Sequence, residues 1–173
     1  MKPRKLPLPR GAGEGVRGCA QAISLLVLLA TACGYHLAPH GAPLAGGVTR
    51  ADVRPFDNHS GDAEAGAFAA AAVREELARR NAMGEGAAAR IEGVVEAVGA
   101  TPSSPNGATW RLTLVISARL VDSSRAVAQA RVARDEEYVT GQDPLETEGR
   151  RRLALRRATQ AAARELVERL EAP

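Results

Sequence analysis

Few residues of this 173-residue chain are of types that carry chemistry on their own. Of its three histidines, His36 and His40 lack the spacing of a metal-ligand pair. The third lies in Asp-Asn-His-Ser at residues 57–60, a sequence that could suggest a catalytic cluster but consists of typical turn residues. The glycine-rich residues 11–15 mimic a phosphate-binding loop, but no expected strand precedes them and no expected helix follows. We therefore expect no metal site, no bound cofactor and no enzymatic activity.

The residue with the clearest chemical role is Cys33, which follows an uncharged apolar run at residues 19–32. This run is too short for a stable membrane-spanning helix, which needs roughly 20 apolar residues. A positively charged leader, a short apolar stretch and small residues at its end predict a cleaved secretory signal peptide over residues 1–32. The alternative is a buried helix of a cytoplasmic protein with Cys33 in its core, and it requires these three features to coincide by accident.

Residues 29–32, directly before Cys33, resemble the lipobox of bacterial lipoproteins. In those proteins the cysteine thiol receives a diacylglycerol, the leader is cleaved before the cysteine, and the new amine is acylated. The resemblance implies the same covalent lipid on Cys33, including palmitate, and Gly34 in place of aspartate implies the outer membrane. Several acyl chains anchor a protein durably, because each buried methylene contributes about 0.8 kcal/mol. Cys19 would leave with the leader, so no disulfide could form.

The charge balance changes once the leader is set aside. The chain has 23 basic and 20 acidic residues, and residues 1–32 hold five of the basic and one of the acidic residues, so 18 and 19 remain. A nearly neutral protein gives no indication of nucleic-acid binding. We expect residues 33–47, rich in glycine and proline, to form the lipidated N-terminus and tether, and residues 48–173 to form a single domain.

The hydrophobic pattern predicts four strands and two helices in the order β-α-β-β-β-α. The clearest strand is 109–122, where apolar residues alternate with polar ones from Trp110 to Leu120. An α+β fold follows, with one four-stranded, mostly antiparallel sheet and both helices packed on one face, while the other face is polar enough to meet water. The other elements are expected at residues 48–56 (strand), 63–81 (helix), 88–99 (strand), 126–138 (strand) and 144–171 (helix).

The spacing of residues also predicts burial within these elements. In the strand at 88–99, alternation places Ala97 among the inward residues. Phe68 lies off the buried stripe of the first helix, either as a hydrophobic staple at the helix start or as an exposed contact residue. Two ion pairs are expected on the solvent side of that helix, namely Glu75 with Arg79 and Glu76 with Arg80. The expected buried helical residues are Ala69, Val73, Leu77, Leu155, Ala158, Ala162, Leu166 and Leu170.

With these elements in order, the chain resembles the LptE family of outer-membrane lipoproteins that assemble lipopolysaccharide (LPS). The resemblance is carried by Cys-Gly-Tyr-His-Leu at 33–37, Val-Arg-Pro-Phe-Asp-Asn at 53–58, the segments 73–77 and 110–114, and the spacing of the last helix. It implies a non-enzymatic protein in the lumen of a large outer-membrane β-barrel, the LPS-translocon subunit LptD. There it would act as plug and assembly partner and would bind LPS.

The same resemblance implies arginine contacts to LPS, because lipid A carries phosphates that arginine can bind in a bidentate manner. The family places basic contact residues near the loop between the second and third strands, but residues 101–107 contain none. The nearest candidates are Arg111 and Arg119 on the open sheet face, with Arg131 on the next strand if its side chain points the same way. The alternative is that all three are simply solvated arginines.

A second class of function stays open at this point. A periplasm-facing regulatory lipoprotein, such as an activator of peptidoglycan synthases or an accessory of a secretion pore, could have a similar small domain. Such proteins often have longer tethers. Residues 34–47 extend at most about 3.3–3.6 Å each, or roughly 50 Å in all, and this short reach favours a partner in the membrane itself.

Overall fold

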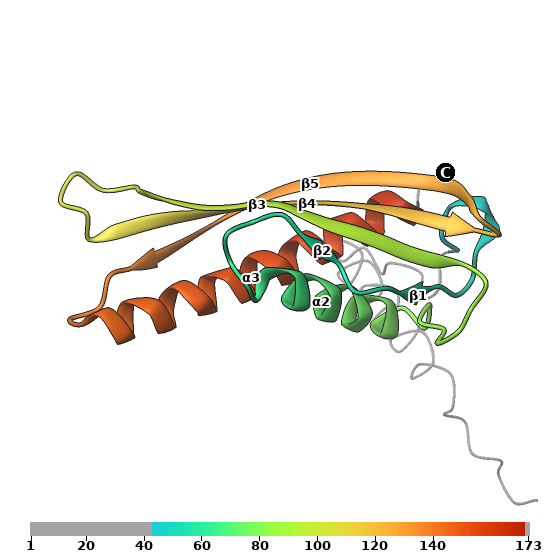
Figure 1. The fold of residues 1–173 in the computed structure, drawn as a ribbon, viewed down its shortest axis with the longest axis horizontal. Helices are drawn as coiled ribbons and strands as arrows, with labels where there is room; N and C mark the ends of the chain where they lie inside the picture. Colours follow the sequence, from blue (N-terminus) through green and yellow to red (C-terminus); the bar gives the residue numbers. More distant parts are fainter. Residues whose placement is uncertain (1–42, 172–173) are drawn as a thin grey trace, which may run out of the picture. The chain divides into compact units, whose positions relative to one another are not determined.

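The computed structural model describes residues 43–171 and contains one mixed sheet with two helices (Figure 1). The predicted signal peptide and Cys33 lie outside the described residues. Within the described part of the chain, no helix has both the length and the apolar character that a membrane span requires. The elements in chain order are a 3-10 turn η1 (Ala45–Gly47), β1 (Asp52–Val53), β2 (Asp57–Asn58), α2 (Ala65–Arg79), β3 (Arg90–Pro102), β4 (Thr109–Asp122), β5 (Arg125–Val139) and α3 (Pro144–Glu171).

The sheet is built on three long strands. β3, β4 and β5 form an antiparallel meander, and β1 and β2 each pair in parallel with β3. Both helices lie on the same side of the sheet (Figure 1), so the predicted α+β fold is confirmed. The first strand, expected as one element at 48–56, is instead two short strands, because Pro55 between them has no N–H to donate to the sheet.

The core lies between the sheet and the helices. All eight helical residues predicted to be inward are buried, and none of them is more than 1% exposed. On β4 the predicted alternation is also confirmed, with Leu112, Leu114, Ile116 and Leu120 fully buried against the helices. The predicted cap of the last helix is present, because Asp143 accepts a hydrogen bond from the backbone N–H of Glu146 at 2.8 Å.

Ala97 is exposed, contrary to the prediction, because β3 contains a bulge. Val95 pairs with Ile116 and Ala97 pairs with Val115, so Glu96 is an extra residue on its strand. A bulge shifts the two-residue period by one, and the residues beyond it change faces. The simple alternation read from the sequence therefore fails after Val95.

Glu76 is buried, with only 4% of its surface exposed, although the sequence placed it on the solvent side of its helix. α2 packs against α3, and Arg80 also binds Glu171 of α3 at 2.7 Å. Arg79 and Arg80 bind the carboxylate of Glu76 at 2.6 and 2.7 Å. The predicted pair of Glu76 with Arg80 is thus confirmed, whereas Arg79 pairs with Glu76 and not with Glu75.

Phe68 is half-buried between the two helices, so it fits neither prediction fully. Its ring packs against the core, and the guanidinium groups of Arg156 and Arg152 lie 4.9 and 5.7 Å from the ring centre. Such cation–π contacts help to hold long arginine side chains in place over an aromatic ring.

The chain enters the described domain beside the start of β5. Leu44 is 1% exposed and belongs to the core, and its backbone forms a bridge to Val48. Gly46, in the η1 turn, lies so close to β5 that an added Cβ would be 3.4 Å from the Val127 side chain. The end of the stretch predicted as a tether therefore packs against the sheet.

We expect Gly93→Ala to lower the free energy of unfolding by about 1–3 kcal/mol, the usual cost of overpacking a core. An added Cβ at Gly93 would lie 2.2 Å from the ring of Phe56, which is itself only 7% exposed. Urea denaturation of the two proteins measures the difference. Gly99→Ala is the matched control on the same strand, because no atom lies within 4 Å of its added Cβ. Equal losses at both glycines would contradict the close packing of Phe56 on Gly93.

Candidate functional site

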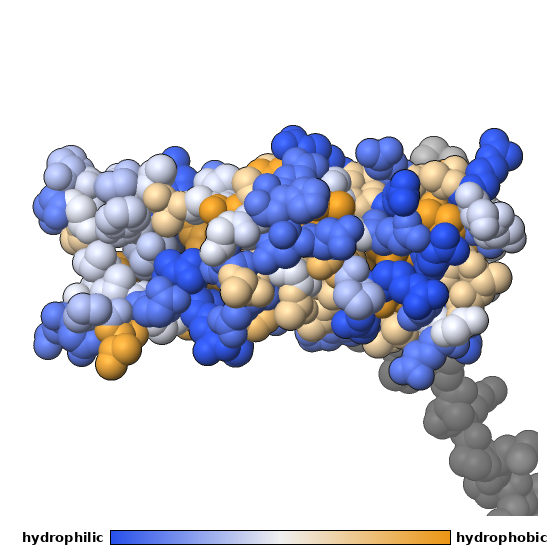
Figure 2. Space-filling view, in the orientation of Figure 1, coloured by the Kyte–Doolittle hydropathy of each residue, from blue (hydrophilic) through white to orange (hydrophobic). Residues whose placement is uncertain are grey.

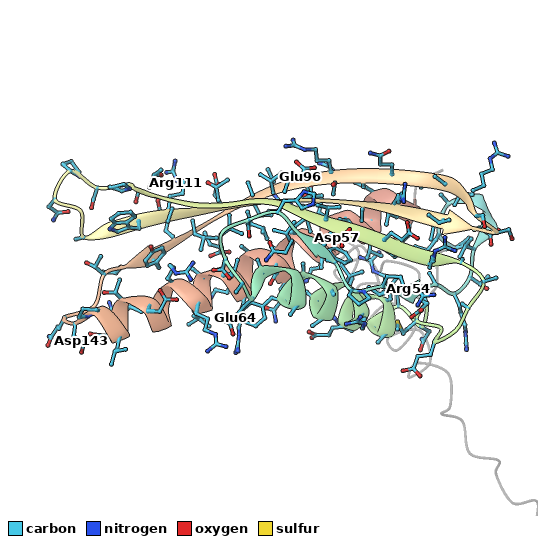
Figure 3. The ribbon with its side chains drawn as sticks, in the orientation of Figure 1. Arg54, Asp57, Glu64, Glu96, Arg111 and Asp143 are labelled. Carbon is cyan, nitrogen blue, oxygen red and sulfur yellow. The ribbon has the colours of Figure 1, made fainter. Side chains whose placement is uncertain are left out.

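The side of the sheet away from the helices forms an open face that carries most of the candidate residues. Because side chains alternate along a strand, burial of the even-numbered residues of β4 leaves Arg111 and Arg119 on this open face. Figure 3 shows Arg111 and Glu96 projecting on the side of the sheet opposite the helices. Figure 2 shows polar side chains spread between apolar ones over the visible surface.

Arg131 joins the other two arginines on the open face. In the register of β4 and β5, Arg131 lies opposite Ser117 and Gln129 lies opposite Arg119, so these four side chains share one face. The side chains of Arg111, Arg119 and Arg131 are 52%, 61% and 63% exposed. The structure therefore brings all three sequence-predicted arginines to one water-exposed surface.

Each of the three arginines has a carboxylate partner on the same face. The sequence did not predict these partners. Arg111 pairs with Glu137 at 3.4 Å, Arg119 pairs with Glu92 at 2.8 Å, and Arg131 pairs with Glu96 at 2.9 Å. The last pair connects β3 to β5 across the intervening strand. It depends on Glu96, the extra residue of the bulge, which no local pattern in the sequence marks.

Two of these contacts favour the ionised form of their glutamates, Glu92 and Glu96. Hydrogen bonds from Arg90 and Arg119 lower the pKa of Glu92 below its ordinary value, and Arg131 together with Ser117 lowers the pKa of Glu96. The open face is therefore a network of alternating charges and not a purely positive patch. Exposed ion pairs are weak in water, so a phosphate group could replace a carboxylate as the partner of an arginine.

A second surface feature is a groove of about 560 Å³ between the end of β5 and the first half of α3. Tyr138 and Val139 line it from the strand, and Leu153 and Arg157 line it from the helix. Val139 is 50% exposed and Leu153 is 48% exposed. The sequence did not predict this groove. One signal was present, because Leu153 is an apolar residue that lies off the buried stripe of its helix and is therefore free to contact another surface.

The possible catalytic cluster of the sequence divides in the structure, because Asp57 and Asn58 form β2 and the chain bends only after them, at Ser60. The Asn58 side-chain oxygen accepts hydrogen bonds from the backbone N–H and the hydroxyl of Ser60, at 3.1 and 2.7 Å. The backbone N–H of His59 donates to the carbonyl of Val95 at 2.9 Å and so fastens this segment to β3. Within residues 43–171, no three side chains of the metal-binding types lie close enough together to hold an ion.

Solved structures with this fold include a protein described as a lipoprotein from Caulobacter crescentus CB15. It has a TM-score of 0.53 and 18% identity, and the match covers 68% of this chain and 88% of that one. The PelC dodecamer from Paraburkholderia phytofirmans gives a TM-score of 0.51 at 16% identity, with 71% and 89% covered. At these identities the likeness concerns the fold alone.

A comparison with curated proteins finds no match. The family model described as LptE, lipopolysaccharide-assembly, matches residues 48–170, which include every element from β1 to α3 and the whole charged open face. Because this match spans well over half of the chain, the chain belongs to the LptE family of lipopolysaccharide-assembly lipoproteins of the cell envelope, a family without enzymatic activity.

Proposed function

We propose that this protein is anchored to the outer membrane by lipid on Cys33, partners and plugs the LptD β-barrel, and helps LPS reach the outer leaflet. The observation that carries the proposal is the family match over residues 48–170. The lipobox-like residues before Cys33 support the anchor. The match gives no support to the alternative of a periplasm-facing regulatory lipoprotein.

The charged open face suits a protein that lies inside a barrel. The lumen of a large outer-membrane barrel is polar and contains water, so contacts to its wall are hydrogen bonds and ion pairs. On the open face, alternating arginines and glutamates can exchange partners with charged groups of a barrel wall without burying an unpaired charge.

The same arginines are the proposed contacts to LPS. Arg119 and Arg131 are more than half exposed, and each is held by one glutamate that a lipid A phosphate could replace. Arginine is suited to this exchange, because its planar guanidinium presents paired N–H groups to phosphate as well as to carboxylate.

We expect the full-length protein, purified from native outer membranes, to co-isolate with a large β-barrel of the LptD type. Depletion of the protein should lower the amount of LPS at the cell surface, as measured by labelling of intact cells. Co-isolation of a peptidoglycan synthase with normal surface LPS would instead support the regulatory alternative and overturn this proposal.

Cys33→Ser should abolish the incorporation of radioactive palmitate into the protein, because serine has no thiol to accept the diacylglycerol. The matched control is Cys19→Ser, which lies in the predicted leader and should leave labelling intact. Undiminished labelling of the Cys33→Ser protein would show that the anchor is elsewhere.

If the open face binds LPS directly, the glutamates compete with the ligand. We expect Glu92→Gln with Glu96→Gln to raise the affinity for purified LPS, because both arginines are released. Arg119→Gln with Arg131→Gln should lower the affinity roughly tenfold or more, since a charge-assisted hydrogen bond contributes about 1.5–3 kcal/mol.

Fluorescence titration with labelled LPS measures both effects, and Arg164→Gln, an exposed arginine of α3, is the control for loss of one positive charge. An unchanged affinity in both double variants would exclude the open face as the LPS contact.

A further inference from the structure

The backbone of β5 has one side without a sheet partner in the described part of the chain. β5 is 15 residues long and pairs with β4 on one side. The ladder continues to Thr140, whose backbone N–H donates to Ala108 at 2.9 Å. Because N–H and C=O groups alternate in direction along a strand, the even-numbered residues of this stretch point to β4 and the odd-numbered residues point outward.

Two arginines of α3 mark the limits of the free edge. Arg169 donates to the outward carbonyl of Arg131 at 2.5 Å, which agrees with this direction. Arg150 donates to the carbonyls of Thr140 and Val139, at 3.1 and 3.4 Å, where the strand ends. Between these two points, the outward backbone groups of Ala133, Asp135 and Glu137 make no hydrogen bond within residues 43–171. A row of unpaired N–H and C=O groups two residues apart is a template for another strand.

The groove between β5 and α3 lies along this free edge. Glu137, Tyr138 and Val139 line it from the strand, and Leu153 and Arg157 line it from the helix. Leu153 is half-exposed, and Arg157 takes part in none of the ion pairs found within residues 43–171. The groove therefore offers an apolar surface and a positive charge beside a backbone edge.

The spacing of these two helical residues matches that of a strand. Leu153 and Arg157 are four residues apart on one helix face, a rise of about 6 Å. Side chains on one face of a strand repeat every two residues, or about 6.6–6.8 Å. A strand laid along the edge would therefore present one side chain to Leu153 and the next side chain on the same face to Arg157.

We propose that an extended segment of another protein adds to the free edge of β5 between Ala133 and Val139, with an apolar side chain on Leu153 and, two residues along the segment, a carboxylate at Arg157. This contact goes beyond the proposed LPS binding, and of the open-face ion pairs it shares only Glu137. The free backbone groups favour a peptide over a lipid, because an acyl chain offers nothing to hydrogen-bond with them. The charged residues Arg134 to Glu137 along the edge disfavour purely apolar strands.

A labelled probe peptide tests this contact on the full-length protein in lipid nanodiscs. The probe is acetyl-Thr-Val-Thr-Glu-Thr-Val-amide with a fluorescein group, and fluorescence anisotropy measures its binding. We expect Arg157→Glu to weaken binding at least tenfold, and a probe with lysine in place of glutamate to bind the Arg157→Glu protein and not the original one. Arg164→Glu, seven residues further along α3, is the matched control and should leave binding unchanged.

Two further measurements separate a strand from a lipid. Hydrogen–deuterium exchange should show slower exchange over residues 133–139 when the probe is bound, and a probe with N-methylated backbone amides should lose binding. Thermal unfolding confirms that each variant is folded. If dodecyl phosphate binds the groove without slowing exchange at residues 133–139 while the peptide fails to bind, the groove is a lipid site and the proposal is wrong. Equal binding of the glutamate and lysine probes would also overturn it.

Discussion

The strict two-residue alternation of β4 is the constraint on which the rest of the structure depends. Its even-numbered residues supply the fully buried leucines and the isoleucine under the helices, and burial of one face fixes the register of the whole meander. A slip of one residue would bury Arg111 and Arg119 and expose the core residues. The charged surface is therefore a direct consequence of apolar packing on the opposite face.

The elements with a strong local period could be predicted from the sequence. β4 and α3 have a long, regular pattern of apolar residues, and their bounds and buried faces are as expected. What could not be predicted depends on residues that are distant in the sequence. The bulge at Glu96 depends on the pairing of β3 with β4, whose register is fixed by its own buried face. The burial of Glu76 depends on the position of α3. The groove beside Leu153 likewise requires a strand and a helix to be placed together.

For the candidate arginines, too, the sequence indicates which face each side chain lies on but not which side chains it contacts. Alternation indicated that Arg111 and Arg119 share a face, and the register adds Arg131 to them. The glutamate partner of each arginine could not be read from the sequence, because all three partners lie on other strands, at separations of 26 to 35 residues. The surface is therefore nearly neutral locally, and any anion that bound there would have to compete with the carboxylates for the arginines. Such a surface tolerates several partners, since each ion pair can be exchanged singly.

Leu44 and the η1 turn pack beside Val127. This packing determines which end of the domain is nearer to an N-terminal membrane anchor. If Cys33 carries the lipid, only ten residues separate it from Leu44 and the η1 turn, which packs beside the start of β5, whereas the groove lies at the end of that strand, roughly 40 Å away along twelve residues. Under the two proposals, the two ends of β5 would face different neighbours, the bilayer at one end and a protein at the other. A pull on the anchor would first separate the η1 turn from Val127 and would then load β1, which pairs with β3 through only two residues, while β5 stays paired with β4.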